Sequence, residues 1–383
     1  MRFPEFSEEW KTTSIGEQFE LYSGNTPTRI NKNQFNGSIN WITSGELKGH
    51  YISDTKEKIS EEAVRNNNLK ILPLGTFVIA IYGLEADGVR STCSITAKES
   101  TISQACMAFT SKKGIQNEFL YSWYKKHGNI IGIKYAQGTK QQNLSYDIIE
   151  KFNISYPSLE EQGKLIRFIS LIDERIATQN KIIEDLKKLK SAIIDQLYSA
   201  IKGKGYSYRQ IFEIVNERNK QLEYSNILSA SQEKGMVNRE DLNLDIQFER
   251  SNINTYKVVR KGDYVIHLRS FQGGYAFSDK IGVCSPAYTI LRPNDLLEFR
   301  YLSYYFTSQK FIKSLIIVTY GIRDGRSINV EEWLDMKTTI PQKEQQRHIV
   351  DTIRNIEKKI ENEELYASYL SKQKQYLLRQ LFI

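Results

Sequence analysis

The sequence is poor in the residues that build metal and disulfide sites. Its 383 residues include three cysteines, Cys93, Cys106 and Cys284, and four widely separated histidines. Three scattered thiols form neither a disulfide framework nor a zinc knuckle, and no His-Glu-x-x-His segment occurs. The sequence therefore predicts a reducing, cytoplasmic location and no metal site.

Long apolar runs and catalytic signatures are also missing. No apolar run approaches the ~20 residues that span a bilayer, so we expect a soluble chain with no membrane partner. No two of the seven prolines are adjacent, which excludes the Asp/Asn-Pro-Pro-Phe/Tyr turn with which an adenine methyltransferase holds its base. Neither a G-x-x-x-x-G-K-S/T loop nor a G-x-G-x-x-G loop after a strand occurs. We therefore predict a non-catalytic chain with no cofactor of its own.

The charge balance points to one class of partner. Lysine and arginine together number 53 against 45 acidic residues, a net charge of +8, and the isoelectric point is about 9.0. A basic surplus favours a polyanion such as nucleic acid. A surplus this mild also occurs in proteins that bind no nucleic acid, so charge alone leaves the partner open.

The chain contains the same long amphipathic segment twice. PSLEEQGKLIRFISLIDERI begins at Pro157, and PQKEQQRHIVDTIRNIEKKI begins at Pro341, 184 positions later. In both, apolar residues follow the 4,3 spacing of a heptad seam, and Lys190 and Lys374 interrupt the two seams at matching positions. The apolar seam residues are Leu165, Ile169, Ile172, Ile176, Ile183, Leu186, Ile193 and Leu197, then Ile349, Ile353, Ile356, Ile360, Leu370, Leu377 and Leu381.

These segments divide the chain into four parts. We predict a globular domain over 1–156, a long helix within 157–202, a second domain over 203–340 and a second long helix within 341–383. LPLGTFVIAIYG in the first domain matches VRKGDYVIHLRS in the second, with Gly75 opposite Gly262, and ISQACMAFT matches CSPAYTIL. The fold class is α+β: two similar α/β domains separated by two long antiparallel coiled-coil helices, with an internal pseudo-twofold repeat.

The antiparallel pairing follows from helix length. Helices of about 40 residues are roughly 60 Å long, and their seams need a partner. Pairing with each other in opposite directions is the simplest solution, and it returns the C-terminal RQLFI to the first domain. Lys190 and Lys374 either fix the register of the coil or reach solvent at its edge.

Four Gly-containing loops carry side chains suited to DNA. Lys and Arg position phosphates, while amide and guanidinium groups read base edges. The loops are 82–90 and 137–143 in the first domain and 269–274 and 320–329 in the second, with 23–29 as a weaker candidate. The candidate DNA-binding residues are Arg29, Arg90, Lys140, Gln141, Gln142, Asn143, Arg269, Gln272, Arg323, Arg326 and Ser327. Polar hairpin turns with only a structural role are the alternative.

The order of these parts resembles the specificity subunits of type I restriction-modification systems. The resemblance covers the whole chain and is most specific at 157–162 and 341–346, where a proline is followed by Glu-x-Gln; WKTTSIGE from Trp10 and SGNTP from Ser23 also look like the start of such a subunit. The second domain lacks a G-x-T-P segment. From the residues alone, a coiled-coil scaffold with two protein-binding domains and no sequence-specific DNA binding is the alternative.

The resemblance has implications for function. Each domain would be a target recognition domain that reads one half of a bipartite, gapped site in double-stranded DNA. The helices would set the spacer and dock two methyltransferase subunits, and restriction and motor subunits would join the complex. S-adenosylmethionine, ATP and Mg would then lie on the partner subunits.

Overall fold

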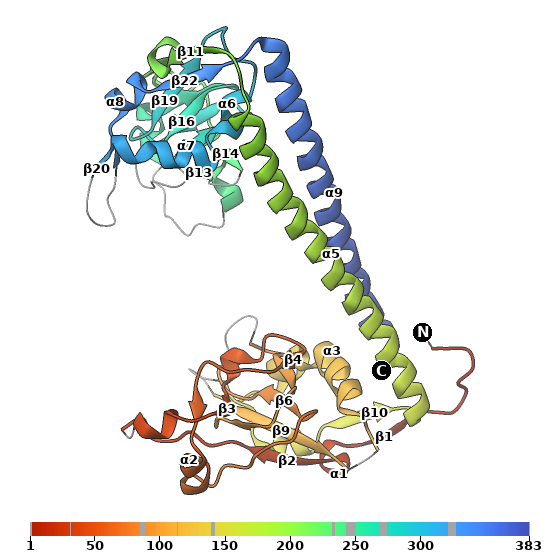
Figure 1. Cartoon of the computed structure of the whole chain (residues 1–383). Coiled ribbons are helices and arrows are strands. Elements are labelled where there is room, and N and C mark those ends of the chain that lie inside the picture. The colour runs from red at the N-terminus through yellow and green to blue at the C-terminus, as the bar shows by residue number, and fades with distance from the viewer. Residues whose placement is uncertain are drawn as a thin grey trace. The chain divides into compact units, whose positions relative to one another are not determined.

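The computed structural model describes residues 2–30, 32–84, 89–112, 114–138, 142–231, 234–242, 250–267, 274–320 and 327–382. It divides into two compact units. Unit 1 contains Met1–Gln179 and Tyr366–Ile383, and unit 2 contains Asn180–Leu365. The division falls within two long helices, α5 (Leu159–Ser199) and α9 (Lys343–Leu381) (Figure 1). No helix in the described part of the chain has the length and apolar character needed to cross a membrane.

Unit 1 is built mainly from short strands that precede α5. The strands are β1 (Lys11–Ser14), β2 (Phe19–Ser23), β3 (Ile39–Ile42), β4 (Tyr51–Ile52), β5 (Lys58–Ile59), β6 (Phe77–Ala80), β7 (Cys93–Thr96), β8 (Ser100–Ile102), β9 (Cys106–Ser111) and β10 (Asn153–Tyr156). The helices are α1 (Ile15–Gln18), α2 (Glu61–Asn66), α3 (Asn117–Tyr135) and α4 (Tyr146–Glu150), with 3-10 turns η1 (Lys32–Phe35) and η2 (Ser44–Glu46).

The main sheet of unit 1 has the strand order β2-β9-β6-β7-β4. Its central strand β6 is buried along its whole length, as an uninterrupted apolar run requires. Gly75 opens the turn before β6 with a φ of +81°, a left-handed conformation that glycine adopts without strain. A smaller sheet has the order β5-β3-β8, and β1 pairs with β10 just before α5 begins.

Unit 2 repeats this plan with different lengths. Its strands are β11 (Lys204–Ser207), β12 (Phe212–Val215), β13 (Leu228–Ser231), β14 (Gly235–Asn238), β15 (Lys257–Val259), β16 (Tyr264–Ile266), β17 (Tyr275–Phe277), β18 (Gly282–Cys284), β19 (Thr289–Pro293), β20 (Thr319–Tyr320), β21 (Ser327–Ile328) and β22 (Lys337–Ile340). Its helices are α6 (Tyr301–Tyr305), α7 (Gln309–Ser314) and α8 (Val330–Asp335), with 3-10 turns η3 (Tyr208–Gln210), η4 (Arg239–Leu242), η5 (Arg250–Thr255) and η6 (Leu315–Val318).

The sheet register confirms the internal repeat. The order β12-β19-β16-β17 in unit 2 reproduces β2-β9-β6-β7 in unit 1. Phe77 lies opposite Phe109 in the first sheet, and Tyr264 lies opposite Leu291 in the second. Gly262 occupies the place of Gly75 and also has a positive φ, +96°. The matched sequence segments therefore form equivalent strands, and the α+β prediction with an internal repeat is correct.

The helical parts of the two units differ more than their sheets. NEFLYSWYKK lies inside the continuous 19-residue α3. In the second domain FRYLSYYFTS, 182 positions later, matches this segment. It forms only the short α6 before the helix ends, and the Ser308 hydroxyl accepts a hydrogen bond from the Phe311 N–H and caps the separate helix α7. A single long helix in unit 1 thus corresponds to α6, α7 and η6 in unit 2.

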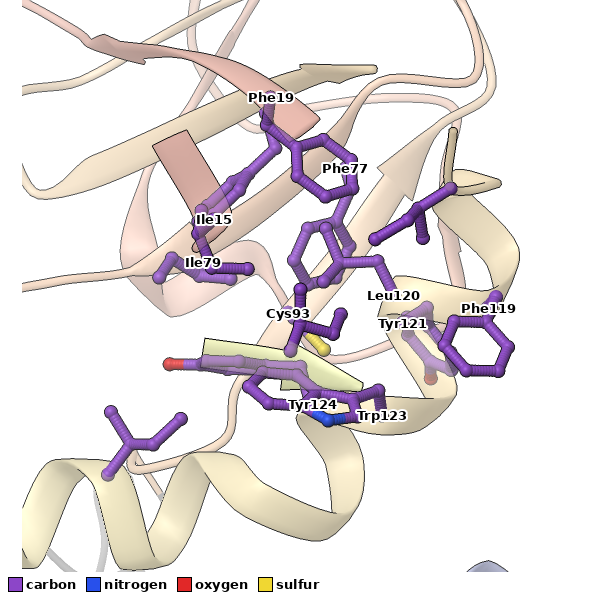
Figure 2. Packing of buried hydrophobic residues seen from close by; sticks show 14 of the residues in the cluster. Ile15, Phe19, Phe77, Ile79, Cys93, Phe119, Leu120, Tyr121, Trp123 and Tyr124 are labelled. Carbon is purple, nitrogen blue, oxygen red and sulfur yellow. The ribbon is translucent and has the colours of Figure 1, made fainter. Parts of the chain in front are cut away.

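The core of unit 1 lies between its main sheet and α3. Figure 2 shows Phe19, Phe77 and Cys93 from the strands packed against Leu120 and Tyr124 of α3. The C-terminal residues Leu381 and Phe382 belong to the same core, and the Phe382 ring lies 5.1 Å from that of Phe119. The expected return of the C-terminus to the first domain is confirmed.

Unit 2 has its own core, which is rich in aromatic side chains. Trp333 of α8 is fully buried and stacks on Tyr208, with ring centroids 4.2 Å apart and the planes almost parallel. Phe306 and Phe311 pack around this pair. Aromatic packing of this kind binds α7 and α8 to the sheet.

The long helices run antiparallel within each unit. In unit 1, Leu165 and Ile169 of α5 share a core with Leu377 and Leu381 of α9, and further along α5 the Asp173 carboxylate lies 2.5 Å from Lys374 Nζ. In unit 2, Ile194 and Tyr198 of α5 share a core with Ile349 and Ile353 of α9. Every apolar seam residue predicted from the sequence is buried or half-buried.

Both seam lysines meet acidic partners. Lys374 pairs with Asp173 in unit 1, and Lys190 pairs with Glu357 at 3.3 Å in unit 2. Asp173 and Glu357 are themselves 184 positions apart, as the two lysines are. The same ion pair is therefore built twice, and we infer that it helps to fix the register of the helices.

A buried glutamine explains the Glu-x-Gln opening of each long helix. Gln162 Nε2 donates to the carbonyls of Pro157 (3.0 Å) and Gly114 (3.1 Å), and its Oε1 accepts from the Gln116 N–H (2.9 Å). In unit 2, Gln346 makes the equivalent three hydrogen bonds, with Pro341, Leu296 and Glu298. Each glutamine is fully buried and ties the start of a long helix to the loop that leads into α3 or α6.

Candidate nucleic-acid interface

Several loops of unit 1 gather at one end of its main sheet. Strands β2 and β6 finish at this end and β9 starts there, because β9 is antiparallel to both. We call it the loop edge. The loop after β2 leaves here, with the Gly24 N–H donating to the Cys106 carbonyl and the Asn25 N–H to that of Ile102. The chain after β6 also leaves here, since the Ile81 N–H donates to the carbonyl of Ala105.

The structure brings two of the sequence-predicted loops together at this edge. The Leu144 N–H donates to the Ile81 carbonyl at 2.9 Å, and the Leu84 N–H donates to the Gln142 carbonyl at 3.0 Å. Gln137 and Asn143 exchange backbone hydrogen bonds and close the second loop. The loops 82–90 and 137–143 are far apart in sequence but form one hydrogen-bonded structure.

The candidate residues of these two loops differ in their surroundings. Gln142 and Asn143 lie on the segment that joins the loops, and both are half-buried. Asn143 Oδ1 is buried and has no hydrogen-bond partner among the described residues. Lys140 and Gln141 lie outside the residues that the structure describes.

Arg90 packs against α3. Gly132 leaves room for it, because a Cβ at that glycine would lie 2.9 Å from Arg90 Cγ. One turn earlier, a Cβ at Gly128 would lie 2.8 Å from the Cα of Ser91. Arg90 Nε is buried and has no hydrogen-bond partner within the described part of the chain. The stem of Arg90 thus fixes the loop to α3. The two glycines of GNIIG, spaced by four on one face of the helix, are the sequence signal for this contact.

Arg29 lies in the loop that follows β2 and is held in place. Its guanidinium makes two hydrogen bonds of 2.9 Å to the Glu57 carboxylate and lies over the ring of Phe35. Through its hydrogen bond, Arg29 lowers the pKa of the Glu57 carboxyl, so this pair is ionised at neutral pH. The side chain of Arg29 remains 65% exposed, which leaves it open to a phosphate.

Unit 2 has a corresponding loop edge, where β12 and β16 finish and β19 starts. The loop after β16 closes with a hydrogen bond from the His267 N–H to the Gly274 carbonyl. Arg269, Gln272, Arg323 and Arg326 lie outside the described residues. Ser327 is described only by its backbone, which pairs with Tyr320 in the hairpin of β20 and β21.

The loop after β12 was not among the predicted candidates, yet it carries charge at this edge. Arg218 and Lys220 lie three and five residues after the end of β12. Asn219 between them is 3% exposed and organises the loop. The Asn219 N–H donates to the Tyr256 carbonyl, and its side chain bonds to the backbone of Tyr224 in both directions. This loop lacks the G-x-T-P pattern of the first domain, so residue type alone did not identify it.

The described residues form no constellation that could hold a metal ion. They include no group of three or more His, Cys, Asp or Glu side chains placed for metal binding. All three cysteines are buried, and this burial raises the pKa of each thiol to about 12. Such thiols stay protonated and are poor nucleophiles.

Several known proteins resemble this chain in sequence. Residues 7–188 match the family model of the type I restriction modification DNA specificity domain. The chain is 29% identical over 185 residues to the specificity subunit of the type I restriction enzyme MjaIX of Methanocaldococcus jannaschii. This aligned region covers 47% of this chain and 42% of that protein. The chain is 28% identical over 192 residues to the EcoR124I/EcoR124II specificity subunit of Escherichia coli, covering 49% and 46%. The match thus spans less than half the length of either relative.

A further relative and two solved structures span almost the whole chain. The MjaVIII specificity subunit of Methanocaldococcus jannaschii is 23% identical over 408 residues, covering 98% of this chain and 92% of that protein. A type I restriction-modification S subunit from M. genitalium has a TM-score of 0.52 at 15% identity, covering 100% and 99%. A structure solved for the assembly and conformational transition of a type I system has a TM-score of 0.65 at 15% identity, covering 98% of both chains. The chain is thus similar to type I restriction-modification specificity subunits, and residues 7–188 carry the match to the DNA specificity domain of that family.

Proposed function

We propose that this chain is the DNA sequence-recognition subunit of a type I restriction-modification complex. Each unit reads one half of a bipartite, gapped site in double-stranded DNA. The chain itself performs no chemistry, and it acts where the cell's DNA lies, in the cytoplasm. S-adenosylmethionine, ATP and Mg belong to the partner subunits.

The duplication of the loop edge is the observation that carries this proposal. Two sheets with the same strand order present loops at the same end, and the loops differ in length and sequence while the sheets agree. A protein that reads two different half-sites can use the same sheet twice, but it needs a different set of contact residues on each copy. The net charge of +8 supplies attraction to the phosphate backbone.

We assign the spacer between the half-sites to α5 and α9. The ion pairs Asp173–Lys374 and Lys190–Glu357 and the glutamine anchors at Gln162 and Gln346 restrict the register of these helices. A fixed register is what a defined spacer length requires. The spacer therefore changes when turns are added to or removed from both helices.

We assign the docking of two methyltransferase subunits to apolar side chains on the outer faces of the helices. Unit 1 exposes Leu171, Tyr369 and Tyr376 to 46%, 57% and 55%. Unit 2 exposes three comparable side chains on its part of the helices, Ile182, Leu189 and Leu365. Exposed apolar side chains on the helices of each unit would allow each unit to bind one copy of the partner, and the restriction and motor subunits then join through the complex.

Methylation sequencing tests the proposal directly. DNA from cells that express this chain with its cognate methyltransferase is compared with DNA from cells that lack this chain. We expect one gapped, bipartite adenine motif that depends on this chain. A complex that forms but methylates no such motif would favour a scaffold, and the assignments at the loop edges would then fail.

Docking is tested separately by size-exclusion chromatography with light scattering. Tyr376→Asp in unit 1 and Leu189→Asp in unit 2 should each remove one of two bound methyltransferase subunits, because a carboxylate is costly to bury in an apolar interface. Loss of no subunit from either variant would contradict the assignment.

A further inference from the structure

Each unit exposes one aliphatic side chain at the tip of the loop that follows the first strand of its main sheet. In unit 1 the residue is Ile30, which is 95% exposed. In unit 2 it is Leu222, which is 59% exposed. Both are the seventh residue after their strand, since β2 ends at Ser23 and β12 ends at Val215.

The loop in unit 1 is held by contacts of Asn25 and Arg29, which both lie before Ile30 in the chain. Asn25 donates its N–H to the Ile102 carbonyl at 3.2 Å, and its own carbonyl accepts from Trp41 Nε1 at 3.2 Å. Next to the tip, Arg29 is fixed by Glu57 through two hydrogen bonds of 2.9 Å. Ile30 therefore stands in solvent on a backbone that its neighbours hold in position.

The loop in unit 2 reaches the same result with different residues. Asn219 accepts from the Tyr224 N–H at 3.2 Å and donates from Nδ2 to the Tyr224 carbonyl at 2.8 Å, which closes the loop. Leu222 lies inside this closed loop with a φ of +57°. The left-handed region is unfavourable for a leucine, so the backbone at this exposed apolar residue is strained.

Stability does not explain this arrangement. A single exposed aliphatic residue is ordinary, but Ile30 and Leu222 occur at the same place in a repeat whose local sequences, GNTPTRI and NERNKQL, are unrelated. Ile30 buries almost none of its apolar surface and Leu222 buries less than half of it. A glycine in place of Leu222 would relieve the strained φ. An apolar contact with something outside the chain accounts for both.

DNA offers few apolar groups to such a side chain. In the major groove the C5 methyl of thymine is the apolar feature of the base edges. We infer that Ile30 and Leu222 are specificity-determining residues that each contact a thymine methyl, Ile30 in the half-site read by unit 1 and Leu222 in the half-site read by unit 2. The inference rests on the proposed function, because it assumes that each loop edge faces one half-site.

The test removes the methyl group from the DNA and the side chain from the protein. The complex of this chain with its methyltransferase is titrated with duplexes of its methylated motif in which single thymines are replaced by uracil, a change that deletes only the C5 methyl. A buried methyl is worth about 0.8 kcal/mol. In each half-site we therefore expect one thymine whose replacement by uracil, made alone, weakens binding about fourfold. Ile30→Ala should abolish the uracil effect in one half-site only, and Leu222→Ala should abolish it only in the other.

Two variants serve as controls. Ile30→Val keeps a branched apolar side chain and should keep the uracil effect. Leu74→Ala removes an exposed leucine, 71% accessible, from the turn before β6 at the opposite end of the sheet, and it should change nothing. The inference is overturned if the complex binds its bipartite motif but Ile30→Ala and Leu222→Ala respond to every uracil as the parent chain does. Absence of any bipartite motif would instead remove the proposed function and this inference together.

Discussion

The two seam ion pairs are alike in sequence but differ in their surroundings, which allows a sharp test. Lys374→Glu places a carboxylate against Asp173. At ~4 Å and an effective dielectric constant of about 20, an attraction of about 4 kcal/mol becomes a repulsion of similar size. The two side chains are 22% and 31% exposed and can turn into water, so we expect the free energy of unfolding to fall by about 2 kcal/mol.

Exchanging the two charges of each pair distinguishes the ion pair of unit 1 from that of unit 2. Asp173→Lys combined with Lys374→Glu restores opposite charges and should recover most of the loss. In unit 2, Lys190→Glu should cause a similar loss, and adding Glu357→Lys should recover much less of it. Glu357 also accepts a hydrogen bond of 2.7 Å from the Tyr304 hydroxyl and lies 3.8 Å from Arg300. A lysine at that position would face Arg300 and leave the buried hydroxyl of Tyr304 without its acceptor.

The measurement is thermal and urea unfolding of the full chain, followed by circular dichroism. Exchange of Glu184 and Lys188, an exposed i,i+4 pair on α5, is the control and should leave the transition unchanged. Equal recovery by both seam swaps would refute the reasoning, because it would mean that Tyr304 and Arg300 contribute nothing to the environment of Glu357. An unchanged transition in Lys374→Glu would show that the pair does not stabilise the seam.

Three further predictions concern buried groups. Gln162→Glu replaces the amide donor with a carboxylate oxygen that faces the carbonyls of Pro157 and Gly114, so the free energy of unfolding should drop by about 3 kcal/mol in urea titrations; an unchanged midpoint would exclude the anchor role. Gly128→Ala meets the backbone at Ser91 and should lower that free energy by about 2 kcal/mol, whereas Gly163→Ala in α5, which meets nothing within 4 Å, should raise it by up to about 1 kcal/mol. The three thiols, whose pKa is raised to about 12 by burial, should not react with iodoacetamide at pH 8 until the chain unfolds. An unfolded thiol ionises near pH 9, so the raised thiol pKa values favour the folded chain fully below pH 9, and this contribution to the free energy of unfolding is lost between pH 9 and about 12. Rapid labelling of the native chain at pH 8 would contradict the prediction.

The long helices and the repeat could be predicted because both are written locally in the sequence. Heptad spacing determines which face of a helix is buried, and a match at a constant offset identifies the duplicated parts. The partners of Lys190 and Lys374 could not be predicted in the same way. Asp173 and Glu357 became their partners through the register of the pairing, which depends on contacts along the whole seam.

The candidate interface was only partly accessible from sequence for a related reason. Residue type and glycine content indicated the loops 82–90 and 137–143, but their union depends on Leu144 pairing with Ile81 across more than fifty residues of chain. Arg90 shows why residue type alone is not enough. An arginine in a loop suggests a DNA contact, but the absence of a side chain at Gly132 of α3 lets the aliphatic part of Arg90 pack against that helix. The loop after β12 was missed because its order comes from Asn219, whose importance appears only in its hydrogen bonds.

The two halves of the chain agree where they hold the molecule together and differ where they face outward. The glutamine anchors make the same three hydrogen bonds, and the seam ion pairs recur at the same offset. The loops after β2 and β12 share neither sequence nor hydrogen-bond donors, yet each holds an aliphatic residue in solvent. Repeated helix contacts together with unlike loops are expected of a protein that recognises two unlike half-sites at a fixed spacing. If the two surfaces read unlike sequences, replacing residues Gly24–Ile30 alone should change one half of the methylated motif and leave the other half and the spacer intact, and methylation sequencing would show this directly.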